Sequence, residues 1–157
     1  MKRIMLFLAC ALIMTGCGRN EQPVPPDQRA RLENLRQELR KTLGEKYDAP
    51  VAAATLPQLK RGSDLFAELC AGCHGARGDG ITEHPGVLLH QPSNFTDEAQ
   101  ATFFSEQARL HLIRKGIPGT AMMGWEEVLP EEDILAIYMY VRYLYQSKQR
   151  QPLFEQE

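Results

Sequence analysis

The 157-residue chain has no stretch that alternates polar and apolar residues at the two-residue period of a half-buried strand. Apolar residues recur at helical spacing instead, so we expect an all-α fold. Long apolar runs are also lacking: the run at residues 4–14 is too short to cross a bilayer, which takes roughly 20 apolar residues. The formal net charge is only −2 at pH 7, and neither charge nor motif indicates a nucleic-acid partner.

Cysteine is scarce, and two of the four cysteines lie in one short motif, Cys70-Ala71-Gly72-Cys73-His74. This C-x-x-C-H run is the attachment signature of c-type haem. A helical turn brings the two thiols to the same side, where each can form a thioether with a vinyl group of the macrocycle. His74 can then point its imidazole at the iron as the proximal ligand.

Two other interpretations of this motif are weaker. A redox dithiol usually accompanies a βαβ pattern, and the sequence has none. A structural zinc site usually draws its other ligands from a second closely spaced pair, whereas His84, His90 and His111 are scattered. We therefore expect one covalent haem c, with these three histidines as surface or partly buried residues.

The N-terminus has the features of an export signal. A short basic start precedes the apolar run, and two small residues precede Cys17. This segment resembles the lipobox of bacterial lipoproteins, although Met14 stands where leucine is more usual. The resemblance implies removal of residues 1–16 and lipidation of Cys17, which would anchor the protein to a membrane, facing the periplasm of the bacterial cell envelope. An ordinary signal peptide is the alternative.

Removal of a signal peptide also simplifies the cysteine content. Cys10 is lost with the signal, Cys17 carries lipid, and the other two cysteines carry haem. No thiol is left over and no disulfide is needed, although an oxidising compartment would permit one.

The expected mature chain has three parts: a lipid-anchored tether (residues 17–56), a haem domain (57–146) and a flexible C-terminal tail (147–157). The tether contains an amphipathic helix with Asp27 as its N-cap and Gly44 as its stop. Its apolar stripe is Leu32, Leu35, Leu39 and Leu43. This helix could pack on the domain, pair with a partner helix or act as a spacer.

Three helices are expected in the haem domain. The first leads through Leu65, Phe66 and Leu69 into the haem motif, and the second spans residues 105–116 with Ser105 as its cap. The third has Pro130 at its first position, followed by an apolar stripe of Ile134, Ile137, Val141 and Leu144. Because so short a domain buries a small share of its surface, we expect the haem-free protein to be poorly folded.

The sixth iron ligand is expected in residues 116–125, which glycine and proline make a loop. Met122 and Met123 are adjacent there, and a loop lets a thioether reach the iron without distorting a helix. Packing is the other use of methionine. The residues themselves do not decide between the two methionines.

Residues 57–144 resemble a class I monohaem cytochrome c of the bacterial, membrane-anchored type. The matching residues are Gly62, Phe66, Cys70, Cys73, His74, Gly75, Gly78, Gly80, Gly119, Thr120, Ala121, Met122, Trp125, Tyr140, Val141 and Arg142. Alignment with the family favours Met122 as the distal ligand, with Met123 as the alternative because the usual following proline is absent. A carbonyl at Ile81 or its neighbours, or at Pro85, is expected to accept the Nδ1–H bond of His74.

This resemblance implies a one-electron carrier rather than an enzyme. Its partners would be periplasmic or membrane redox proteins (an oxidase, a reductase or a dehydrogenase), and it could act alone or as a subunit of a respiratory complex. The alternative is a peroxidase-like haem enzyme or a haem sensor with an open sixth position. An acidic cluster after the methionine loop could dock a basic partner or simply cap a helix and face solvent: Glu126, Glu127, Glu131, Glu132 and Asp133.

Overall fold

The computed structural model describes residues 24–82, 86 and 88–150. Over these residues it is helical with no strand, which confirms the all-α expectation. The predicted signal (1–16), Cys17 and the last seven residues of the predicted tail lie outside the described residues. The elements are α1 (Pro26–Leu43), the 3-10 turn η1 (Gly44–Lys46), α2 (Leu56–Leu69), α3 (Ala71–His74), α4 (Glu98–Ala101), α5 (Glu106–Lys115) and α6 (Glu131–Arg150). None of the described helices is both long and apolar enough to cross a membrane.

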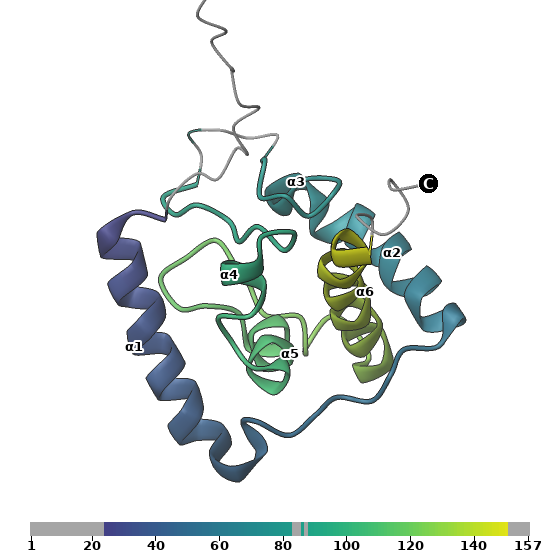
Figure 1. Ribbon diagram of the computed structural model, residues 1–157, viewed down its shortest axis with the longest axis horizontal. Coiled ribbons are helices and arrows are strands. Elements are labelled where there is room, and N and C mark those ends of the chain that lie inside the picture. Colours follow the sequence, from purple (N-terminus) through teal and green to yellow (C-terminus); the bar gives the residue numbers. More distant parts are fainter. Residues whose placement is uncertain (1–23, 83–85, 87, 151–157) are drawn as a thin grey trace, which may run out of the picture.

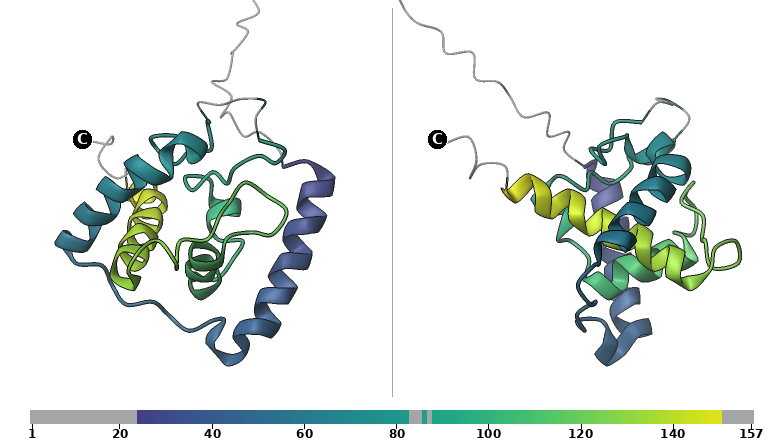
Figure 2. Two further views of the ribbon diagram at one scale, coloured as in Figure 1. Left: turned by 180° about the vertical axis from the view of Figure 1, so that it is seen from behind. Right: turned by 90° about the vertical axis from the view of Figure 1, so that its right-hand side faces the viewer.

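Helices α2 and α6 cross and form the most extensive helix–helix contact (Figures 1 and 2). Gly62 allows their close approach, because a Cβ there would overlap the carbonyl of Ala136 in α6. Around this crossing lies the main hydrophobic cluster, formed by Leu65, Phe66, Leu110, Ile113, Ile134, Ile137, Tyr138 and Val141.

Helix α1 lies on the opposite side of the molecule from α2 and packs against α5 (Figure 1). Leu39 is buried there, and the three other stripe leucines are partly buried. They meet a second cluster, whose other buried members are Tyr47, Phe104, Ala108 and Leu112. The leucine-striped helix therefore packs on the domain, which was the first of its three possible uses.

Two polar side chains fasten the segment that joins α1 to α2. Glu106 Oε2 accepts a hydrogen bond from Val51 N at 2.8 Å, and Arg142 Nη1 donates to Val51 O at 3.0 Å. Arg142 Nη2 also donates to Ala52 O at 2.7 Å, while Arg142 and Glu106 form an ion pair at 3.0 Å. Helices α5 and α6 thus hold a stretch that has no regular structure of its own.

Most helices begin or end at the capping residues that the sequence predicts, but two of these predictions were wrong. Ser105 Oγ accepts from Ala108 N as predicted, but Asp27 is not the N-cap of α1. The N-cap is Pro25, whose carbonyl accepts a hydrogen bond from Arg29 N. The helix begins there because the fixed φ of Pro26 suits the first helical position. Helix α6 begins at Glu131, one residue after the predicted Pro130, whose carbonyl accepts its first hydrogen bonds.

Two further elements differ from the sequence-based expectations. Helix α6 continues to Arg150 and so includes residues 147–150, which were expected to belong to the C-terminal tail (147–157). The chain has no helix breaker there until Pro152. The short helix α4 was not predicted, although Asp97 caps it by accepting a hydrogen bond from Gln100 N at 3.0 Å.

Candidate haem-binding site

The C-x-x-C-H motif forms the expected helical turn. The capping box of Thr55 and Gln58 starts α2, which delivers the chain to Cys70. From there Cys73 N and His74 N both hydrogen-bond to Cys70 O, at 3.2 and 2.9 Å. This turn is α3, and it places the two cysteines three residues apart in one helical segment.

Both cysteines of the motif are half-buried, and they are not joined in a disulfide. Burial, with a smaller contribution from Cys73, raises the pKa of Cys70 to about 11. The Cys70 thiol is therefore protonated at neutral pH. Cys70 therefore lacks the lowered pKa that activates a nucleophilic thiol.

The proximal candidate His74 is held on two sides. Its Nδ1 lies 3.1 Å from Ser93 O, and its ring stacks on Phe95 with centroids 4.6 Å apart. Burial lowers the pKa of His74 more than the hydrogen bond to Ser93 raises it. The imidazole is thus neutral, with Nδ1 engaged and Nε2 left to bind a metal.

The carbonyl that accepts from His74 was predicted in the wrong place. It belongs to Ser93 and not to Ile81 or a near neighbour; Pro85 lies outside the described residues. The physical reason is that the acceptor lies 19 residues after His74 in the sequence, so the contact depends on tertiary packing and not on a local pattern. Pro92 could have indicated this carbonyl in the sequence, because proline restricts the backbone just before the acceptor residue Ser93.

The segment after Ser93 is anchored to the glycine-rich turn that follows the haem motif and to α4. Phe95 N donates to Gly78 O at 2.7 Å, and Asn94 N donates to the side chain of Gln100 at 3.0 Å. Neither Ser93 nor Phe95 was identified from the sequence, because both contact His74 across about twenty residues of chain.

The methionine loop is closed tightly at its base. Ile117 N donates to Met122 O at 2.8 Å, and Met122 N donates to Thr120 Oγ1 at 3.1 Å. Gly116 has a φ of 73°, and a Cβ there would lie 2.5 Å from Met122 O. Only glycine fits such a position. Met122 is half-buried, whereas Met123 is 55% exposed.

Trp125 fixes the far end of this loop to α5. Its backbone N lies 3.1 Å from Ile113 O and 2.9 Å from Arg114 O. The indole packs against the main hydrophobic cluster. The loop is therefore held at both ends by backbone hydrogen bonds.

The remaining histidines and the acidic cluster have structural surroundings. His90 Nε2 lies 2.9 Å from Arg31 Nη1 on α1, His111 is half-buried on α5, and His84 is outside the described residues. Three acidic residues of the cluster form ion pairs: Glu126 with Lys115, Glu131 with Arg114, and Asp133 with Arg61. These pairs neutralise much of the charge that a docking surface would need.

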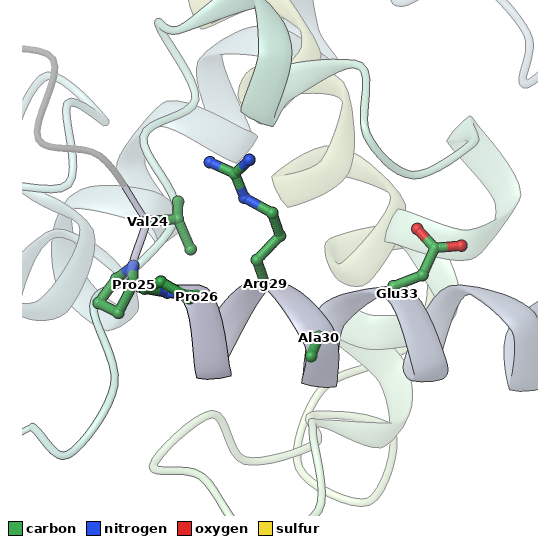
Figure 3. A pocket seen from close by; sticks show the side chains of 6 residues that line it. All are labelled: Val24, Pro25, Pro26, Arg29, Ala30 and Glu33. Carbon is green, nitrogen blue, oxygen red and sulfur yellow. The ribbon is translucent and has the colours of Figure 1, made fainter.

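An open hollow of about 690 Å³ lies beside the first turns of α1 (Figure 3). Arg29 and Glu33 extend from the same side of that helix. None of the residues predicted to bind haem lines this hollow. Its lining residues are Val24, Pro25, Pro26, Arg29, Ala30 and Glu33.

The side chains of the motif and the loop fit a haem c group. Two cysteines in one helical turn, a neutral imidazole with one nitrogen engaged and a thioether in a braced loop are the donor types of such a group. Across the described part of the chain, no group of three or more His, Cys, Asp and Glu residues is arranged to hold a metal ion.

Comparison with known proteins agrees with this geometry. Residues 57–141, more than half of the chain, match the family described as cytochrome c oxidase, cbb3-type, subunit III. None of the curated proteins matches the chain. Members of this family are c-type cytochromes, haem-based electron carriers with covalently bound haem c, and such domains are typically extracytoplasmic. The chain therefore belongs to the family of c-type cytochromes described as cytochrome c oxidase, cbb3-type, subunit III.

Proposed function

We propose that this protein is a monohaem, one-electron carrier between redox partners in the bacterial cell envelope, anchored to a membrane by lipid on Cys17. Cys70 and Cys73 hold the haem by two thioethers, and His74 and Met122 ligate its iron. The observation that carries the proposal is the Nδ1 contact of His74 with Ser93 O, because it leaves Nε2 as the ligating atom. The donor and the acceptor belong to the oxidase, reductase or dehydrogenase class.

When bound, haem c supplies the one-electron couple of ferric and ferrous iron. The residues around the haem would keep the same two ligands in place in the ferric and the ferrous protein. The Ser93 carbonyl orients the His74 ring and raises its basicity, and the hydrogen bonds of residues 117–122 hold the loop of Met122. Neither ligand carries a proton that must leave on oxidation. With both of these side chains as ligands, no position would remain for a substrate, which favours transfer of electrons over catalysis.

The test is the full chain matured in a bacterial periplasm. Its intact mass should equal that of the processed, acylated chain plus one haem, and the ferric spectrum should show the methionine–iron band at the red end. Reduction and oxidation should be reversible without peroxide turnover. The double variant Cys70→Ser/Cys73→Ser is the matched control and should be colourless.

Three results would contradict the proposal. A colourless wild-type protein would remove the haem altogether. A high-spin ferric spectrum with peroxide turnover would assign the protein to haem enzymes. Rapid binding of carbon monoxide to the reduced protein would indicate a sensor with an open sixth position.

A further inference from the structure

Helix α1 precedes the residues that match the cytochrome family, yet it reaches the proximal side of the haem site. Figures 1 and 2 show its first turn beside the segment that leads into α4. The contact is made by Gln28, one of two buried polar residues in the described part of the chain. A buried polar side chain of this kind needs hydrogen-bond partners.

Gln28 satisfies both backbone groups of a single distant residue. Its Nε2 donates to Gln91 O at 2.8 Å, and its Oε1 accepts from Gln91 N at 3.1 Å. The two bonds together require one orientation of the side-chain amide. They join positions 63 residues apart in the sequence, so the pairing belongs to the tertiary structure. We name it the Gln28 clasp.

The clasp lies two residues before the carbonyl that accepts from His74. Between Gln91 and Ser93 stands Pro92, whose ring fixes φ and so stiffens the connection. On its other side Ser93 is already anchored through Phe95 and Asn94. The clasp therefore supplies a buried attachment before Ser93, and the two attachments together hold its carbonyl in place.

We propose that α1 braces the proximal ligand, and that Gln28 is a positioning residue that holds the Ser93 carbonyl against His74 Nδ1. This inference rests on the proposed function, because it needs His74 to ligate iron. A carbonyl held at hydrogen-bond distance makes the imidazole a more basic ligand, which favours ferric over ferrous iron. Loosening the carbonyl should therefore raise the reduction potential.

The test compares three variants of the full haem-loaded protein. Gln28→Ala removes the clasp, and Gln28→Met removes its hydrogen bonds while keeping a side chain of similar length. Gln37→Ala is the matched control, because Gln37 is exposed on the same helix. The measurements are the reduction potential and the exchange rate of the His74 Nδ1–H proton by NMR.

Both Gln28 variants should shift to higher potential and exchange the Nδ1–H proton about tenfold faster, because both hydrogen bonds that hold Gln91 are lost. Gln37→Ala should match the wild type in both measurements. An unchanged potential and exchange rate in Gln28→Met would overturn the brace while leaving the haem and its ligands in place. A wild-type protein without haem would instead contradict the proposed function.

A measurement on the unaltered protein covers the case in which the Gln28 variants fail to mature. The Gln91 amide and the His74 Nδ1–H should exchange through one shared opening, and hence with the same free energy of opening. Exchange of the Nδ1–H proton that is unrelated to exchange of the Gln91 amide would overturn the proposal.

Discussion

Met122 and Met123 are neighbours in sequence but have different surroundings. Met122 is half-buried, and both of its backbone groups are hydrogen-bonded within the loop. Met123 is 55% exposed and lies beside Gly116, with which it forms an isolated bridge. Because Met122 is the more buried of the two, we expect its thioether, and not that of Met123, to be the iron ligand.

Replacement of each methionine tests this assignment. Met122→Ala should abolish the methionine–iron band of the ferric spectrum and lower the reduction potential on the order of 0.2 V, within the roughly 0.8 V range that axial ligands control. Met123→Ala should change neither the band nor the potential appreciably. If Met123→Ala lost the methionine–iron band and Met122→Ala kept it, the ligand would be Met123.

At the scale of elements, the crossing of α2 and α6 depends on the absence of one side chain. A methyl group at Gly62 would overlap Ala136 O and lie 3.0 Å from Tyr140 Cβ. Backbone cannot move aside as a flexible side chain can, so the helices must separate. Phe66 and Tyr140, whose rings are 5.4 Å apart, would lose their contact as a result.

We expect Gly62→Ala to lower the free energy of unfolding by about 1–3 kcal/mol, measured by denaturant titration of the haem-loaded protein. Ala67→Val is the control, because Ala67 is exposed on the same helix; its effect should stay within about 0.5 kcal/mol. Equal stabilities of the two variants would mean that the helices do not need this close approach.

The ion pair of Glu106 and Arg142 joins α5, α6 and the segment before α2. Burial raises the pKa of Glu106, but the hydrogen bonds from Val51 and Arg142 lower it more, so the net pKa lies below its ordinary value of 4.5. A carboxyl with a lowered folded-state pKa contributes stability above its unfolded pKa. That contribution is lost as the pH falls through the folded value.

Glu106→Gln should therefore be less stable than the wild type at pH 7, by about 1–2 kcal/mol for the lost charged hydrogen bonds. The difference in free energy of unfolding should shrink as the pH falls below about 4.5. The measurement is a series of thermal melts of both proteins from pH 7 to pH 3. A difference that stays constant over this series would show that the charge of Glu106 contributes nothing.

For the whole molecule, the two hydrophobic clusters are small and lie on different sides of α5. A short domain buries a small share of its surface, and covalent haem adds a large apolar body for side chains to contact. Protein made without haem, as the Cys70→Ser/Cys73→Ser variant, should lack a cooperative thermal transition in calorimetry. A native-like cooperative melt of that variant would show that the polypeptide core suffices.

The periodicity of apolar residues predicted the long helices, because helix formation and amphipathic burial depend on residues three and four apart. The stripe of α1, the cap at Ser105 and the turn of the haem motif follow from such local rules. Asp27 was misplaced because Pro25 and Pro26 start α1 without a side-chain cap, and Pro130 lies one residue before the first residue of α6. The sequence identified the glycine-rich turn, but it did not predict that Ser93, beyond this turn, contacts His74.

The sequence by itself therefore determined the helical class, the thiols and imidazole of the haem motif, and a loop with two methionines, since each is a local pattern. Only the tertiary structure decided that α1 packs on α5, that Ser93 accepts from His74, and that Gln28 pairs with Gln91. The last two of these contacts join residues 19 and 63 positions apart. Spacing along a chain carries no information about such pairs until packing brings them together.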